Sequence, residues 1–421
     1  MSGGSAVGGG GAGSAAAGMP SVGGAAGSGV AGAATGGGGA ASSAGSGGSG
    51  IVYPFEPQGP PFTTKADLFK QDSVDTLGLA KAPGTETASI FKPTDSTDKF
   101  CNGVVLTAFK GYLYAQWQSS PKDEDSTDTW TAYSRSQDGK TWSAPLVLAA
   151  KSSDQRASGG WWVSGDTLVA YINVYPTGAT PRGGYTEFRT STDGLTWATA
   201  KKLPTLAGGT LDGIFEQDPH ALPDGRIVSA AHFSPGLMVA PVYTDDPTGT
   251  AGWVRAPFPS LSNNGQITRE IEPSWFLRAD GAIVMVFRDQ DSTYKKLASM
   301  SGDRGATWTK PVITDMPDSR AKQSAGNLPS GVAYQVNSPV TTNRRSPLVV
   351  ALSRDGRVFD KAFALRFGGS ELQPLRYAGK AKTLGYDYPK SMVHDGFLYV
   401  GYSVNKEDVE YTRVPLTSLA Y

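Results

Sequence analysis

Short apolar runs separated by turn residues recur from about residue 100 to the end of the chain. The first runs are 104–106, 112–117 and 129–133, and they are rich in Val, Leu, Tyr, Trp and Thr. Runs of this length and composition are typical of β-strands. Glycine-containing tight turns join pairs of runs at six places, namely 110–111, 165–166, 224–225, 280–281, 330–331 and 395–396. The pattern therefore predicts an all-β chain with six such hairpins.

A second kind of turn repeats at a nearly fixed spacing. Its fullest copy is SGDRGATW at 301–308, with shorter copies at 136–142, 191–197 and 353–359 and a stretched copy from 245 to 253. The aromatic residues that close these turns, at positions 142, 197, 253, 308 and 359, are 55, 56, 55 and 51 residues apart. In such a turn Asp accepts backbone N–H bonds and Gly adopts the left-handed backbone. The period predicts one unit copied around an axis, as in a six-bladed β-propeller of four-stranded antiparallel blades.

The way the ring closes is the least certain feature of this architecture. The last unit, from 388 to 416, supplies three strands, and we expect residues 87–91 to add its outer strand. This exchange would leave the sheet without a free edge. Alternatively, residues 53–91 form a seventh blade without the repeated turn. In both cases the propeller domain is expected to span residues 53–421.

Residues 1–52 differ sharply from the rest of the chain. Residues 1–50 are mostly Gly, Ala and Ser, with no charged or aromatic side chain. Such a segment is unable to bury a core, so we predict a disordered linker. It lacks the basic start and leucine-rich run of an export signal. We interpret it as a spacer and expect a secreted or surface-tethered protein, the alternative being a low-complexity tail on a cytoplasmic protein.

Charge and cysteine content exclude several classes of partner. The chain has 38 basic and 38 acidic residues without a basic run, which argues against nucleic acid or an anionic membrane as its main partner. A single cysteine, Cys101, excludes an internal disulfide and a cysteine-based zinc site. No metal-ligand spacing or phosphate-binding glycine loop is present. We expect a monomer without a metal or cofactor, acting on a glycan or an acidic oligosaccharide.

The predicted topology assigns candidate residues to one end of the ring. Both kinds of turn lie at the same end, so the opposite mouth receives the starts of the innermost strands and the loops after the second strands. Charged and aromatic residues concentrate there: Asp125, Arg156, Tyr175, Arg182, Glu216, His232, Arg269, Glu272, Arg288, Lys322, Arg345 and Tyr388. Arginine suits a carboxylate ligand because its fork donates two parallel hydrogen bonds. Alternatively, these charges pair with one another around a solvated funnel.

The repeated turns, together with several motifs, resemble the Asp-box (BNR-repeat) sialidase superfamily over about residues 86–421. The motifs are EPS at 272–274, Arg288 ahead of the turn at 301–308, NSP at 337–339 followed by Arg345, and Tyr388 before Ser391. The resemblance implies that Tyr388 is a nucleophile assisted by Glu272, and that Arg288 and Arg345 bind a carboxylate, with Arg344 as the rival in register. It further implies Asp125 as acid/base, with Glu124 and Asp128 as rivals.

One departure leaves the substrate open. Where the family has its first arginine, this chain reads KFCNG at 99–103. Arg156 and Arg269 are the candidates to substitute for it, and we also assign Lys322 and Tyr175 to substrate binding. Sialic acid, a uronic acid and a neutral sugar all remain compatible with this set. A tyrosine needs an adjacent carboxylate to act as nucleophile because its free pKa is near 10.

We favour a glycoside hydrolase of exo-sialidase type, but two other functions fit the sequence. The first is a polysaccharide lyase in which His232 or a tyrosine takes a proton next to a uronate carboxylate. The second is a non-catalytic glycan-binding propeller, since Asp boxes specify a fold rather than an activity. His220 and His394 are interpreted as structural because they lie near the opposite turns.

Overall fold

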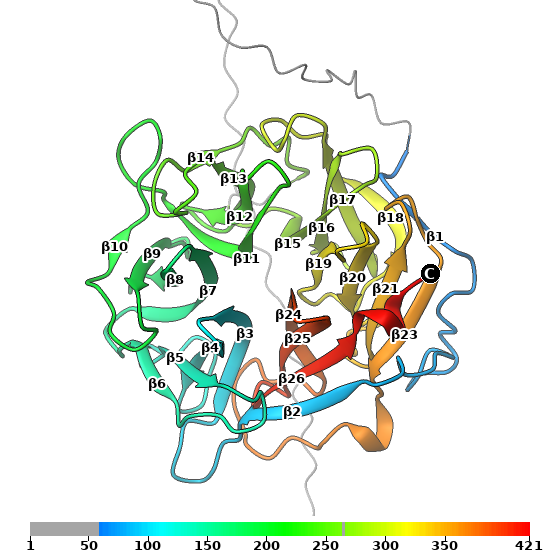
Figure 1. Ribbon diagram of the computed structural model, residues 1–421, viewed down its shortest axis with the longest axis horizontal. Helices are drawn as coiled ribbons and strands as arrows, with labels where there is room; N and C mark the ends of the chain where they lie inside the picture. The colour runs from blue at the N-terminus through cyan, green and yellow to red at the C-terminus, as the bar shows by residue number, and fades with distance from the viewer. Residues whose placement is uncertain (1–58, 263–265) are drawn as a thin grey trace, which may run out of the picture. The chain divides into compact units, whose positions relative to one another are not determined.

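The computed structural model of the chain describes residues 59–262 and 266–421, and its strands form six four-stranded sheets. The sheets surround a common centre and follow one another in chain order (Figure 1). Neighbouring strands within each sheet pair antiparallel, as in the first sheet. The all-β, six-bladed propeller predicted from the sequence is confirmed. The predicted linker at 1–52 lies outside the described residues.

Each sheet has one strand next to the central channel and three strands farther out (Figure 1). The innermost strands are β3 (Phe100–Phe109), β7 (Gln155–Ser164), β11 (Gly213–Ala221), β15 (Glu270–Leu277), β19 (Ser324–Asn327) and β24 (Tyr386–His394). The second strands are β4 (Tyr112–Ser120), β8 (Thr167–Tyr175), β12 (Ile227–Phe233), β16 (Ile283–Asp289), β20 (Ala333–Asn337) and β25 (Phe397–Val404). The third strands are β5 (Trp130–Ser136), β9 (Tyr185–Ser191), β13 (Met238–Thr244), β17 (Lys295–Ser301), β21 (Leu348–Ser353) and β26 (Asp408–Pro415). The outer strands are β6 (Leu146–Ala149), β10 (Lys201–Lys202), β14 (Val254–Arg255), β18 (Val312–Pro317), β23 (Lys361–Arg366) and β2 (Glu86–Phe91).

The ring closes because a strand from the start of the propeller completes the sheet formed by the end of the chain. Strand β2 pairs antiparallel with β26, so the N-terminal segment completes the last sheet. This confirms the predicted closure. Among residues 59–85 the structure describes only a short strand, β1 (Thr63–Thr64), which pairs parallel with β22 (Val358–Phe359). The alternative of a seventh blade from residues 53–91 is therefore wrong for the part of that segment that is described.

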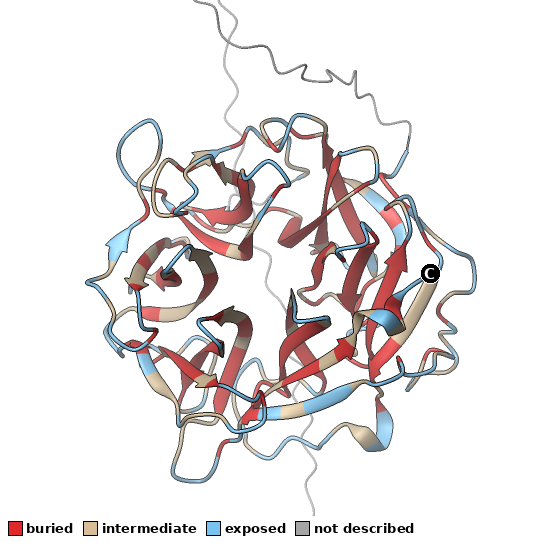
Figure 2. Cartoon of the chain, in the orientation of Figure 1, coloured by how far each residue is buried: buried red, intermediate tan, exposed pale blue. Residues whose placement is uncertain are grey.

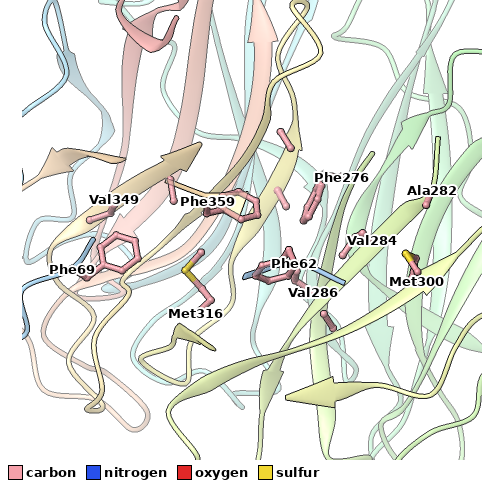
Figure 3. Close-up of a cluster of buried hydrophobic side chains, with 14 of the residues drawn as sticks. Phe62, Phe69, Phe276, Ala282, Val284, Val286, Met300, Met316, Val349 and Phe359 are labelled. Carbon is pink, nitrogen blue, oxygen red and sulfur yellow. The ribbon is translucent and has the colours of Figure 1, made fainter. Parts of the chain in front are cut away.

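The core consists of apolar clusters between neighbouring sheets, which explains why the inner strands are mostly buried while outer strands such as β2 and β10 are more exposed (Figure 2). Among the described residues, one cluster joins each adjacent pair of blades, including the last and the first. In the cluster between the fourth and fifth blades, Phe62 packs edge-on against Phe276 and Phe359, with ring centroids 5.9 and 5.2 Å away (Figure 3). The segment before β2 therefore contributes to the core as well as to ring closure.

The repeated Asp turns are held by hydrogen bonds to their own backbone. Asp138 Oδ1 accepts the N–H groups of Lys140 and Thr141 at 2.8 and 2.7 Å, and these bonds hold the pKa of Asp138 below its usual range. The indole of Trp142 donates to the Gly139 carbonyl at 3.1 Å. The turn is thus a closed local unit, which is why its sequence is so recognisable.

Both kinds of turn lie at one end of the ring, as predicted. Lys110, in the inner hairpin turn of the first blade, donates to the carbonyl of Thr192 in the Asp turn of the second blade at 3.0 Å. Arg304, in the Asp turn of the fourth blade, pairs with Asp224 in the inner turn of the third. The opposite end is therefore formed by the starts of the innermost strands. Short 3-10 helices at Gly369–Glu371 and Leu416–Leu419 complete the described part, and no described helix is long and apolar enough to span a bilayer.

Candidate active site at the channel mouth

A cavity of about 170 Å³ lies at the end of the channel opposite the Asp turns. The starts of the innermost strands and the ends of the second strands form its wall. The lining residues that matter for chemistry are Glu124, Tyr175, Arg182, Glu216, His232, Glu272, Lys322 and Tyr388. These residues come from all six blades, so the ring closure described above is what assembles them.

Backbone bulges direct several of these side chains into the cavity. The register of β15 against β16 shifts between Ile271 and Ser274, and the register of β24 against β25 shifts between Asp387 and Lys390. Glu272 and Tyr388 occupy the two bulges, and each has a left-handed φ of +53°. A non-glycine residue in this region is strained, and such strain concentrates at functional sites. The bulges thus orient both side chains away from the alternation of their strands.

Glu272 and Tyr388 lie in the wall of the same cavity, and the Tyr388 hydroxyl is among the groups that influence the pKa of Glu272. Glu272 is 8% exposed, and its Oε2 accepts a hydrogen bond from Arg288 Nη1 at 3.1 Å. Burial opposes the charged form of Glu272, but Arg288, Lys322 and Arg345 together lower its pKa to about 2, and a hydrogen-bonding interaction with the Tyr388 hydroxyl adds a smaller contribution. Glu272 is consequently a carboxylate at all ordinary pH values.

Three cations lie over the ring of Tyr388. Lys406 Nζ is 5.1 Å, the Arg345 guanidinium carbon 5.3 Å and Lys322 Nζ 5.5 Å from the ring centroid. Burial raises the pKa of Tyr388 well above its ordinary value and Glu272 adds to the increase, while Arg345 and Arg288 oppose it. The phenol is therefore protonated at rest, in a setting where any negative charge that develops on its oxygen is stabilised by positive groups.

The structure distinguishes Arg345 from its neighbour Arg344. Arg345 is 9% exposed and forms a buried ion pair with Asp387, next to Tyr388. Arg344 faces away and pairs with Asp75 and with Ser346. Arg345 is thus the arginine that belongs to the site. A slip of one residue in register would reverse this assignment.

Two predicted substrate-binding arginines are placed away from the cavity. Arg156 pairs with Glu187 of its own blade at 3.3 Å. Arg269 forms a two-pronged bond with Asp289, at 2.8 and 2.9 Å, and also contacts Asp291. Neither residue lines the cavity, so neither replaces the missing first arginine. Asn102 lines the wall at that place and donates to Glu124 Oε1 at 3.3 Å.

The acidic residues after the second strand of the first blade differ in position. Glu124 lines the cavity and pairs with Lys406 at 2.7 Å. The Asp125 side chain is 40% exposed and pairs with Arg182 at 2.7 Å and Lys380 at 3.6 Å. Asp125 does not line the cavity. Asp128 bonds locally to Ser126. Of these candidates, Glu124 is the one directed toward Tyr388.

His232 lies in the cavity wall, but its two ring nitrogens already face protein groups. Its Nε2 accepts the backbone N–H of Glu272 at 3.4 Å, and its Nδ1 lies 3.4 Å from Glu216 Oε1. Burial lowers the pKa of His232 although Glu216 opposes this. His232 thus connects two parts of the site. His220 and His394 line a separate cavity near the turns, consistent with the prediction that they lie outside the mouth.

Glu216 and Lys406 are central to the geometry, and the sequence assigned neither of them a role. Glu216 Oε2 pairs with Lys322 Nζ at 2.5 Å, and Lys406 links Glu124 to the ring of Tyr388. Their common signal was position, at a strand start and in a mouth loop. Among the described residues, no group of three or more His, Cys, Asp and Glu side chains is arranged to hold a metal ion.

Comparison with known families agrees with the geometry. The family described as "BNR repeat-like domain" matches residues 111–400. The chain belongs to this BNR repeat-like family. No curated protein matches the sequence.

Solved structures similar to this BNR repeat-like protein include several sialidases. One, named "Sialidase", is 17% identical with a TM-score of 0.61, and the match covers 85% of this chain and 35% of the other. A Hadza microbial sialidase is 15% identical with a TM-score of 0.60, covering 77% and 67%. The Trypanosoma rangeli sialidase in complex with sialic acid is 14% identical with a TM-score of 0.57, covering 81% and 60%. This chain thus spans about a third of the first sialidase, and the likeness establishes a sialidase-like fold.

Proposed function

We propose that this protein is a glycoside hydrolase of exo-sialidase type that removes a terminal acidic sugar from a glycan. The observation that carries the proposal is that Tyr388 and Glu272 line one cavity, with three cations over the Tyr388 ring. A glycan-binding protein has no need of a buried carboxylate beside a strained phenol. The names of the sialidases with a similar fold support the same reaction class.

In the proposed reaction, Tyr388 Oη attacks the anomeric carbon as the glycosidic C–O bond breaks. The phenol proton passes to Glu272, whose carboxylate is adjacent and ionised. Because Tyr388 is protonated at rest, the transfer takes place as the new bond forms, and Arg345, Lys322 and Lys406 stabilise the charge that develops. Water then hydrolyses the glycosyl–tyrosine intermediate, and the two-carboxylate pattern of most glycosidases is replaced by the Tyr/Glu pair.

A carboxylic acid must protonate the leaving oxygen. We assign this step to Glu124, because it lines the cavity together with Tyr388, whereas Asp125 is more exposed and does not line it. Arg288 and Arg345 are the proposed partners of the substrate carboxylate. Neither lines the cavity itself, but Arg288 bonds to Glu272 and Arg345 lies over the ring of Tyr388, which both line it. Each donates through Nη1 to a protein carboxylate, and a guanidinium carries further N–H donors.

The lyase alternative receives less support. A base must have a free lone pair, but His232 Nε2 already accepts the Glu272 N–H. We also retain export to the cell surface or the exterior as part of the proposal, since a glycan substrate is consistent with that location.

The decisive experiment is a panel of aryl glycosides and oligosaccharides ending in sialic acid, a uronic acid or a neutral hexose. We expect release of an intact acidic sugar by the wild-type protein and loss of at least about 1,000-fold of this activity in Tyr388→Phe. Tyr386→Phe is the matched control, because the Tyr386 hydroxyl donates to the Phe367 carbonyl on the other side of the strand. An unsaturated uronate product would support the lyase, and binding without turnover would support the glycan-binding module.

A further inference from the structure

The channel through the ring is divided into two cavities. The mouth cavity contains Glu216 and Tyr388 in its wall, while the cavity toward the turns, of about 620 Å³, contains Asp218 and Ser391. Among the described residues, the two cavities share no lining side chain. Along β24 the residue between Tyr388 and Ser391 with a long charged side chain is Lys390, which is only 4% exposed.

Lys390 reaches across the channel from the sixth blade to the third. Its Nζ donates to the backbone carbonyl of Glu216 at 2.7 Å and lies 3.2 Å from Asp218 Oδ1. In a ring of six blades the third and sixth are opposite each other. One ammonium group therefore joins opposite walls of the channel directly beneath the mouth cavity.

The carbonyl that accepts this bond belongs to a residue that organises the site. The Glu216 carboxylate bonds to Lys322 at 2.5 Å and faces His232 at 3.4 Å, and His232 Nε2 accepts the N–H of Glu272. A chain of contacts thus runs from the strand of Tyr388 through Lys390, Glu216 and His232 to the backbone of Glu272. Tyr388 and Glu272, which lie in the wall of the mouth cavity, are therefore also connected by a second set of contacts beneath that cavity.

We propose that Lys390 is a positioning residue, whose ammonium group spans the channel and fixes Tyr388 and Glu272 in reacting geometry through Glu216 and His232. This inference rests on the proposed function of the same site. It assigns no contact between Lys390 and the substrate. Its expected signature is a loss of kcat rather than of substrate binding, because a displacement of about 1 Å in a reacting group is enough to lower a rate roughly 100-fold.

The contacts of Lys390 also predict a dependence on pH. The charged groups that face it are Asp218 and Glu216 on β11 and Lys322 from the start of the fifth blade, with His220 behind Asp218 at 2.9 Å. Burial lowers the pKa of Lys390 to about 8, with Asp218 limiting the decrease. The side-chain amine of Lys390 is therefore charged below about pH 8 and loses its charge above it.

The test uses Lys390→Met, which keeps an apolar stem, and Lys390→Arg, which keeps the charge at higher pH. On the substrate found with the panel, we expect Lys390→Met to lower kcat at least about tenfold at pH 7 with KM within about threefold of wild type. The wild type should lose activity as the pH rises through about 8. Lys390→Arg should retain part of the wild-type rate and lack this decline. Lys390→Met should be slow at every pH. Wild-type kcat and an unchanged alkaline decline in Lys390→Met would overturn the proposal.

Lys382→Met is the matched control for removing a buried lysine. Lys382 pairs with Glu407 at 3.1 Å with a side chain 2% exposed, and it lines neither cavity. We expect its kcat to stay within about twofold of wild type. An equal loss of kcat in both variants would show a general effect of destabilisation and would overturn the specific role of Lys390.

A second measurement separates this inference from the proposed function. The folded-state pKa of Lys390 lies below its unfolded value of 10.5, so between about pH 8 and 10.5 the unfolded chain binds more protons and the free energy of unfolding rises with pH. Thermal unfolding of the wild type should show this rise relative to Lys390→Met. If no glycan is hydrolysed, the proposed function fails. The pH dependence of unfolding still tests whether the buried Lys390 ammonium group bridges the channel. Parallel curves for the two proteins would overturn it.

Discussion

The two ends of the channel use the same residue types in opposite ways. At the turn end, Asp138 and Asp193 accept backbone N–H groups of their own loops, and those bonds hold the pKa of each carboxyl below its usual range. At the mouth, the pKa of Glu272 is lowered by cations from three other segments, although burial opposes it. The carboxylates of Asp138 and Asp193 are satisfied within their own turns and maintain the fold. A carboxylate at the mouth depends on distant partners, which is the arrangement expected of a site.

The backbone shows the same contrast. At the turn end the left-handed positions belong to glycines such as Gly139, at φ +70°, and to exposed residues of the turns such as Lys110 and Arg304, at φ +46° and +63°. At the mouth, Glu272 and Tyr388 are both at φ +53° and lie in bulges within strands. Glycine would relieve that strain, so large side chains in those bulges indicate that the side chains are needed.

The sharpest test of this contrast exchanges one carboxylate at each end. Glu272→Gln should lower hydrolysis of the acidic glycan by about 1,000-fold, since the phenol loses the base that takes its proton. Asp303→Ala, at the turn end, removes bonds to Thr307 and Ser301 and should leave kcat unchanged while lowering the free energy of unfolding by about 1–2 kcal/mol. Initial rates and urea unfolding measure both. Equal loss of activity in the two variants would remove the distinction between the ends.

The adjacent arginines give a second, smaller contrast. Arg345→Ala should reduce kcat/KM for the acidic glycan about 100-fold, because a buried guanidinium next to Tyr388 is lost and Asp387 loses its charged partner. Arg344→Ala removes a partly exposed pair with Asp75 and should change kcat/KM by less than about twofold. Steady-state kinetics on the same substrate compares them. A larger effect at Arg344 would mean that the register of this segment is wrong.

At the turn end, we expect stability to depend on the volume of the side chains, whereas at the mouth activity depends on their charge. A Cβ on Gly194 would lie 2.0 Å from the hydroxyl of Tyr114, at a φ that side chains disfavour. We expect Gly194→Ala to destabilise the fold by about 2–3 kcal/mol with kcat unchanged in the folded fraction. Gly225→Ala has a similar φ with no atom within 4 Å and should cost only about 1 kcal/mol. Chemical denaturation of the pair checks the order, which equal values would contradict.

The smallest predicted effect concerns acid stability. The pKa of Glu272 is about 2 in the folded protein, below its ordinary value of 4.5. Its contribution to stability is therefore complete above about pH 4.5 and is lost as the pH falls toward 2. The difference in melting temperature between the wild type and Glu272→Gln should shrink over that interval. A constant difference would mean that the carboxylate is not stabilised by Arg288 and its neighbours.

The sequence was more informative about the turn end than about the mouth. The hairpin turns and Asp turns are local, so their repetition was enough to predict six blades and to assign the candidate residues to one end of the ring. The partners of the mouth residues are distant, and the sequence could not show that Asp289 holds Arg269 or that Glu187 holds Arg156. The bulges that orient Glu272 and Tyr388 depend on pairing with neighbouring strands. Distinguishing Glu124 from Asp125 required knowing which of two adjacent carboxylates faces the cavity.

The central claim is that Tyr388 forms a bond to the sugar with Glu272 as its base. It is tested most directly by trapping the intermediate with a fluorinated analogue of the sugar that the panel identifies, followed by mass spectrometry of the intact protein and its peptides. We predict one sugar adduct on the peptide that contains Tyr388, absent from Tyr388→Phe and formed much more slowly in Glu272→Gln. An adduct on another residue, or rapid turnover of the analogue by Tyr388→Phe, would contradict the account.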